Sequence, residues 1–125
     1  MTRTFTVWDS STQALQVAST GDFAPLGINE HADDYTLALG DAGIVIEMNK
    51  GTAVTVTVPK NSSVAFSMGT IVGIRQKGAG TVTIAPVDGD VTINYTDGLS
   101  IIDQYGVAVL LKVGSNTWSA FGALE

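Results

Sequence analysis

Apolar residues alternate with threonine along several short stretches in the second part of the chain. The stretch 54–58, Val-Thr-Val-Thr-Val, is the clearest case, and similar alternation recurs at 81–84, 91–95 and 105–113. Side chains alternate between the two faces of a β-strand, so a period of two places the apolar residues on one face. The pattern therefore predicts short β-strands, each with one face toward a core.

Turn-forming residues separate these stretches at intervals of about ten residues, a spacing that is typical of β-sandwiches and barrels. We therefore predict an all-β fold, a single sandwich or barrel-like domain of short antiparallel strands. A helix of one or two turns is compatible with the sequence only at 62–66 and 99–104. The turn signals are Asn49-Lys50-Gly51, Pro59-Lys60-Asn61, Gly78-Ala79-Gly80, Asp88-Gly89-Asp90, Asp97-Gly98 and Gly114-Ser115-Asn116.

The strand predicted at 105–113 differs from the others because both of its faces are apolar. One face carries valines and a leucine at alternate positions, and the other carries Ala108 and Leu110. Strands that are apolar on both faces are usually covered on both faces. We therefore expect this strand to be buried between two layers.

Three segments, 55–59, 81–86 and 91–94, have similar sequences. A solenoid would repeat such a segment at a regular spacing, but the spacing between these three is uneven. We therefore interpret the similarity as shared strand chemistry and not as a solenoid repeat.

The first 34 residues have a mixed composition and contain only short apolar pieces. We predict that residues 1–34 form an N-terminal arm or attachment segment, and that residues 35–125 form the β-domain. A chain of 125 residues is long enough for one domain with a core of its own. Trp8 lies in the arm, away from the predicted core, where an exposed aromatic side chain would anchor an interface.

Composition and charge exclude several classes of protein. Apolar residues make up 45% of the chain and charged residues 14%, which argues against disorder. The net charge is −6 and lysine and arginine form no run, so binding to nucleic acid or to an anionic membrane is not expected. The chain contains no cysteine, so it has neither disulfides nor a thiolate zinc site. Its first residues do not resemble a signal peptide, and we expect synthesis in the cytoplasm.

The sequence contains few candidates for catalysis or metal binding. His31 is the only histidine, and with Asp33 and Asp34 nearby it could be a metal ligand or a general base. A second histidine with metal-ligand spacing is missing, which favours a solvated side chain. Glu47 could pair with Asp41 or Asp103 as a glycosidase does, but the aromatic lining of a sugar cleft is not evident.

Two other groups of residues have both a functional and a structural interpretation. The sequence Asp88-Gly89-Asp90 offers calcium ligands but fails the EF-hand spacing, and it is also an ordinary hairpin turn, which we favour. Trp118 and Phe121 could form a platform for sugar stacking, but residues at the end of the last strand more often fix that strand to the core. We therefore predict no enzyme activity and no catalytic, cofactor-binding or metal-binding residues.

The domain carries an ordered series of short motifs that resembles a β-domain of tailed-bacteriophage virion proteins. Domains of this kind occur in capsid decoration (cement), head-fibre and tail-fibre proteins, and the resemblance covers about 90 residues. The motifs are Tyr35-Thr36-Leu37, Asp41-Ala42-Gly43, Ile46-Glu47-Met48-Asn49, Val54-Thr55-Val56-Thr57-Val58-Pro59, Asn61-Ser62-Ser63-Val64-Ala65-Phe66, Gly69-Thr70, Gln76-Lys77-Gly78-Ala79-Gly80-Thr81-Val82-Thr83-Ile84, Val91-Thr92-Ile93-Asn94, Gln104-Tyr105-Gly106, Leu111-Lys112-Val113, Asn116-Thr117-Trp118 and Phe121-Gly122.

The resemblance implies a structural protein of a virion. Because one such domain and a short arm make up the chain, we expect a capsid decoration protein that stabilises the head. Its arm would add a strand to a sheet edge of the major capsid protein, with Phe5, Val7 and Trp8 as side-chain anchors. The resemblance also implies self-association, with a homotrimer as the natural symmetry. The alternative is a phage fibre or receptor-binding module that recognises a host cell-surface glycan.

Overall fold

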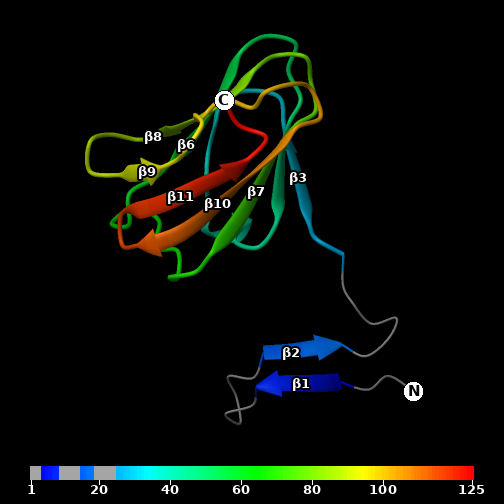
Figure 1. Cartoon of the computed structure of the whole chain (residues 1–125), viewed down its shortest axis with the longest axis vertical. Coiled ribbons are helices and arrows are strands. Elements are labelled where there is room, and N and C mark those ends of the chain that lie inside the picture. Colours follow the sequence, from blue (N-terminus) through cyan, green and yellow to red (C-terminus); the bar gives the residue numbers. More distant parts are fainter. Residues whose placement is uncertain (1–3, 9–14, 19–24) are drawn as a thin grey trace.

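A computed structural model of the chain describes residues 4–8, 15–18 and 25–125 (Figure 1). The predicted all-β class is confirmed, and the 3-10 turn η1 (Leu39–Asp41) is the single helical element in the described residues. The stretches 62–66 and 99–104, where a short helix was compatible with the sequence, form turns and isolated bridges instead. The strands are β1 (Thr4–Trp8), β2 (Leu15–Ala18), β3 (Ile28–His31), β4 (Tyr35–Thr36), β5 (Val45–Met48), β6 (Val54–Val58), β7 (Ile71–Gln76), β8 (Val82–Pro86), β9 (Thr92–Asn94), β10 (Val107–Gly114) and β11 (Thr117–Gly122).

From β3 to β8 the chain passes back and forth between two sheets. The six-stranded sheet has the order β3-β5-β7-β10-β11-β9, and the three-stranded sheet has the order β4-β6-β8. Successive strands within each sheet are parallel along this part of the chain. These residues therefore wind as stacked coils, in the manner of a parallel solenoid.

The predicted antiparallel pairing is wrong for the coils and correct only where the chain leaves them. β10 is antiparallel to β7 and to β11, whereas β9 is parallel to β11. Alternation of apolar and polar residues identifies a strand, but it says nothing of the direction of the neighbouring strand. The sequence pattern could not distinguish a coil from a hairpin for this reason.

Two of the three similar segments, 55–59 and 81–86, contain strands that pair in register with each other. The interpretation of their similarity as shared strand chemistry alone is therefore wrong. Val54 of β6 is paired with Val82 of β8, and Val56 is paired with Ile84. The buried residues of the two strands therefore form continuous ladders that face the core. The third segment, 91–94, contains β9, which joins the other sheet beside β11.

Two glycines allow the corners of successive coils to lie against each other. The Gly78 and Gly80 amides donate hydrogen bonds to Met48 O and Lys50 O, at 3.1 and 2.8 Å. A Cβ atom at Gly80 would overlap the backbone of Thr52. The sequence Gly78-Ala79-Gly80 is therefore required by a close approach of two backbones.

The hydrophobic core lies between the two sheets. β6 and β8 contribute valines and isoleucine from one side, and β5, β7, β10 and β11 contribute from the other. Trp118 of β11 is the largest fully buried side chain and contacts Phe66 edge to face, with ring centroids 5.4 Å apart. Trp118 therefore joins the last strand to the loop between β6 and β7.

The N-terminal segment contains a two-stranded antiparallel hairpin of β1 and β2. Its register shifts between Thr6 and Trp8, and Trp8 is paired with Leu15. The predicted domain boundary before Tyr35 stays a prediction, but β3, which precedes that residue, is hydrogen-bonded to β5 as the edge strand of the six-stranded sheet.

Candidate functional site

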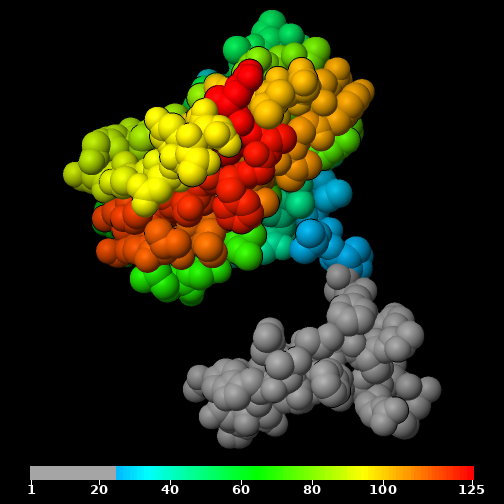
Figure 2. All heavy atoms as spheres, viewed as in Figure 1, coloured from blue at the N-terminus to red at the C-terminus, as the bar shows by residue number. Residues whose placement is uncertain are grey.

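The face of the six-stranded sheet that points away from the core carries a continuous row of apolar residues. We call this side the outer face. Strand register places Ile28, Val45, Gly73, Val109 and Phe121 side by side across β3, β5, β7, β10 and β11. Ile28 is 64% exposed and Phe121 is 51% exposed, so the row lies at the surface. Figure 2 shows β10 and β11, in orange and red, as part of the molecular surface.

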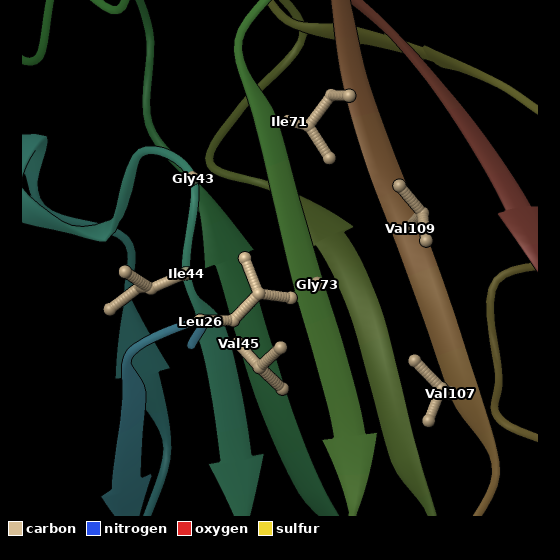
Figure 3. A pocket seen from close by; sticks show the side chains of 8 residues that line it. All are labelled: Leu26, Gly43, Ile44, Val45, Ile71, Gly73, Val107 and Val109. Atoms are coloured by element: carbon tan, nitrogen blue, oxygen red, sulfur yellow. The ribbon is translucent and has the colours of Figure 1, made fainter. Parts of the chain in front are cut away.

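The outer face is hollowed at Gly73, where the row lacks a side chain. The hollow has a volume of about 360 Å³ and an apolar lining. Figure 3 shows side chains from Leu26, β5, β7 and β10 gathered around this glycine. A Cβ atom at Gly73 would come within 3.2 Å of Val45 Cγ2, so the strand register leaves little room for a larger residue. The lining residues are Leu26, Gly43, Ile44, Val45, Ile71, Gly73, Val107 and Val109.

Charged side chains form the next row of the outer face. Glu30, Glu47 and Arg75 are neighbours in the register of β3, β5 and β7. Arg75 forms an ion pair with Glu47, and Lys77 Nζ lies 2.8 Å from Glu30 Oε1. The hydrogen bond from Lys77 is the main cause that lowers the pKa of Glu30 and raises the pKa of Lys77. The charges of this row therefore neutralise one another.

Tyr105 is held in a strained conformation next to the charged row. Its φ is 71°, and it is the single residue other than glycine with a positive φ in the described residues. Its N–H donates to Gln76 O at 2.6 Å, and Gly106 N–H donates to Asp103 O, which closes a turn. Arg75 Cζ lies 5.4 Å from the centroid of the Tyr105 ring, and Tyr105 is 61% exposed. Positive φ disfavours a tyrosine, so the turn keeps this ring at a cost.

The expectation that the strand at 105–113 is covered on both faces is wrong for the isolated chain. Ala108 and Leu110 are fully buried in the core, but Val107 and Val113 on the outer face are 41% and 47% exposed. The sequence signal was sound, since both faces are apolar. What it could not show is that the residues described by the structure cover only the inner face of this strand.

Trp118 and Phe121 do not form a shared platform. Trp118 is buried on the inner face of β11 with 1% exposure, whereas Phe121 lies on the outer face. The structural interpretation is confirmed for Trp118. Phe121 belongs to the apolar row instead, a role that the alternation along β11 could have revealed.

The candidate acids for catalysis are held apart by other partners. Glu47 pairs with Arg75, and neither Asp41 nor Asp103 forms a hydrogen bond with it in the described structure.

Asp41 is buried and accepts hydrogen bonds from Tyr35 Oη at 2.6 Å and from the Ala38 amide at 2.8 Å. Burial, followed by this hydrogen bond, raises the pKa of Tyr35 to about 12. Asp41 therefore fixes the first coil.

His31 is partly buried, which corrects the interpretation of a solvated side chain. Its ring stacks on Tyr35 with centroids 3.7 Å apart and an interplanar angle of 19°. Its Nε2 is buried without a hydrogen-bond partner among the described residues. Asp33 forms an ion pair with Lys50, and Asp34 accepts a hydrogen bond from the Thr55 amide. The three residues are thus spread over separate contacts.

Asp88-Gly89-Asp90 forms a turn as predicted, but not a hairpin turn, because β8 and β9 belong to different sheets. The Asp90 amide donates to Asp88 Oδ1 at 2.9 Å, and both carboxylates form ion pairs with Lys60. Across residues 4–8, 15–18 and 25–125, no group of three or more histidine, cysteine or acidic side chains has the geometry of a metal site. In the same residues no helix is long and apolar enough to cross a membrane.

Phe5, Val7 and Trp8 all lie on β1, but their side chains are outside the part of the chain that the structure describes. Their predicted role as anchors therefore stays a prediction. Comparison of the chain with protein-family models, with curated proteins and with solved structures finds no match. The function must be inferred from the residues and the geometry alone.

Proposed function

We propose that this protein is a structural protein of a bacteriophage virion that decorates and stabilises the capsid. It acts by binding and not by catalysis, and it assembles as a homotrimer on the outer shell. The single observation that carries the proposal is the apolar outer face, which runs across five strands and is hollowed at Gly73. Exposed apolar surfaces of this extent mark sites of protein association.

The motifs that resemble phage virion domains support the proposal from the sequence. Several of them fall where the fold needs them, such as Val54-Thr55-Val56-Thr57-Val58 in β6 and Gly78-Ala79-Gly80 at a coil corner. A rigid stack of coils with interlocked corners suits a protein whose work is mechanical. Such a module ties neighbouring shell subunits together against the pressure of packed DNA.

The N-terminal hairpin is the part that contacts the major capsid protein in this proposal. β1 pairs with β2 and with no other strand of the described chain, so one edge of each strand is free to pair with a sheet edge of the shell. Main-chain hydrogen bonds would supply affinity, and Phe5, Val7 and Trp8 would supply specificity.

Occupancy on purified shells tests this attachment. Shells that lack the protein are mixed with the wild-type chain or with Trp8→Ala, and bound protein is quantified after sedimentation. We expect saturable binding of the wild type and at least a tenfold loss of affinity for Trp8→Ala, with unchanged circular dichroism. Tyr95→Ala is the control, because this exposed aromatic lies in the domain and not in the hairpin. Equal occupancy for Trp8→Ala and the wild type would refute the attachment site.

A receptor-binding module is the second candidate function. The observation that favours it is the exposed Tyr105 ring next to Arg75, which is itself paired with Glu47, since aromatic rings with nearby polar groups also bind sugars. Binding of the fluorescently labelled protein to intact host cells, abolished by Tyr105→Ala, would favour it over decoration.

A further inference from the structure

We infer that the outer face is the surface through which copies of this chain bind one another. The occupant of the face is a second copy of the same chain and not the capsid. This inference rests on the self-association in the proposed function, and it assigns that association to particular residues. Three independent observations support it: the extent of the apolar surface, its charge balance and the strained Tyr105.

The extent of the apolar surface is that of a site of protein association. Six of its apolar side chains are at least 41% exposed, and they lie on or beside four strands of one sheet face. The hollow at Gly73 adds a socket into which a side chain of the second copy can pack. The exposed members of this surface are Leu26, Ile28, Ile71, Val107, Val113 and Phe121.

The charge balance of the outer face favours an identical partner. The chain carries a net charge of −6, so two copies repel each other at most orientations. On the outer face, however, Glu47 is paired with Arg75 and Glu30 with Lys77, and the adjacent row is apolar. A face with internally neutralised charges can meet its own copy without like-charge repulsion. A strongly charged partner would instead need unpaired charges to bind.

The two sides of the outer face differ, which allows a closed ring. Leu26, Ile44 and Val45 of β5 line one side of the hollow at Gly73, and Val107 and Val109 of β10 line the other (Figure 3). β3 lies beyond the first side and β11 beyond the second. A ring with three-fold symmetry needs two different surfaces on each subunit, one for each neighbour. The outer face supplies both.

Tyr105 lies at one end of this interface, next to the row of charged side chains. A glycine at this turn would adopt a φ of 71° without strain, so the fold alone does not explain a tyrosine there. Strained residues are typical of functional sites, and tyrosine and arginine are enriched among the residues that dominate interface affinity. The Tyr105 ring on Arg75 is therefore assigned as the anchor of the interface.

Sedimentation equilibrium of the full chain tests the inference with a matched pair of substitutions. Val107 on the outer face and Val87 after β8 are 41% and 46% exposed. A glutamate at 107 would face Arg75, its partner in the register of β7 and β10, so the fold should tolerate Val107→Glu. We expect the wild type and Val87→Glu to associate, and Val107→Glu to be a folded monomer by circular dichroism.

Tyr105→Gly is a second test that does not depend on how the fold tolerates an added charge. This substitution relieves the backbone strain and removes the ring, and we expect self-association at least ~30-fold weaker than that of the wild type. A monomeric wild type at high protein concentration, or unchanged association of Val107→Glu and Tyr105→Gly, would overturn the inference. A monomeric wild type would also refute the homotrimer of the proposed function, whereas unchanged association of the two variants would refute only this interface. Neither result bears on binding to the shell, because occupancy on shells is measured separately. Loss of shell binding with retained self-association would refute the attachment and not this interface.

Discussion

Thr55 lies directly opposite Thr83 in the parallel pair of β6 and β8. The two threonines occupy the same position in successive coils, and each has a buried apolar residue on either side. Their alignment shows that the two similar sequences, 55–59 and 81–86, contain strands that stack on each other in successive coils. The corners between the coils must stack as well, which makes the glycines at 78 and 80 a test of the architecture.

Gly80→Ala is expected to destabilise the fold. The added Cβ atom would overlap the Thr52 backbone, and overpacking of this kind costs about 1–3 kcal/mol. Gly89→Ala is the matched control, because a Cβ atom added at that turn would have no other atom within 4 Å. Urea unfolding measures both variants, and equal stability of the two would contradict the close approach of the corners.

Trp118→Ala should lower the stability of the fold and Phe121→Ala should weaken self-association, although the two residues are on one strand. Trp118 fills the core, and its removal is expected to cost about 3–5 kcal/mol of unfolding free energy. Phe121→Ala should cost less than about 1 kcal/mol in dissociated protein and should weaken self-association. Chemical denaturation at low protein concentration, together with sedimentation, separates the two effects. A large loss of stability for Phe121→Ala in the monomer would place its ring in the core.

The pKa of Tyr35 predicts a loss of stability at alkaline pH. Burial and the Asp41 hydrogen bond raise this pKa to about 12 in the folded state, whereas tyrosine in an unfolded chain ionises near 10. The contribution is therefore complete below about pH 10 and is lost as the pH rises toward 12. Unfolding midpoints of the wild type should fall more steeply over this range than those of Tyr35→Phe. Parallel curves for the two proteins would contradict the assignment.

Lys112 is expected to hold the connection between β6 and β7 against the sheet. It is 3% exposed, and its Nζ donates hydrogen bonds to Asn61 Oδ1 and Phe66 O, both at 2.7 Å. Burial lowers the pKa of Lys112. Lys112→Met leaves both acceptors unpaired and should cost about 1–3 kcal/mol.

Lys60→Met is the control for this substitution, because Lys60 forms ion pairs at the surface. Thermal unfolding should show a clear decrease in Tm for Lys112→Met and a much smaller change for Lys60→Met. The same Tm for both variants would show that the buried ammonium group does not hold the connection.

The sequence predicted the strands of the domain but not their arrangement. Alternation located β6, β8, β9 and β10 because side-chain burial has a period of two in any sheet. Strand direction depends on how the connecting segments cross between the sheets, which alternation does not report. The coils differ in length, so the repeat has no regular spacing in the sequence. The pairing of Val54 with Val82 became visible only in the fold.

The candidate surface was hidden in the sequence for a different reason. The sequence pattern predicts burial for an apolar residue such as Val109, but it does not tell whether another strand or a second molecule covers that residue. Glu47 and Arg75 are far apart in the sequence, and only the register of β5 and β7 brings them together. The strain at Tyr105 depends on backbone geometry that no motif encodes.

Gold labelling of intact phage particles, read by electron microscopy, shows whether the protein covers the head. An antibody against the domain 35–125 is used, and particles that lack the protein serve as the control. We expect label spread evenly over the head. Label confined to the tail tip would contradict decoration and support the receptor-binding module, and particles without any label would contradict a place in the virion.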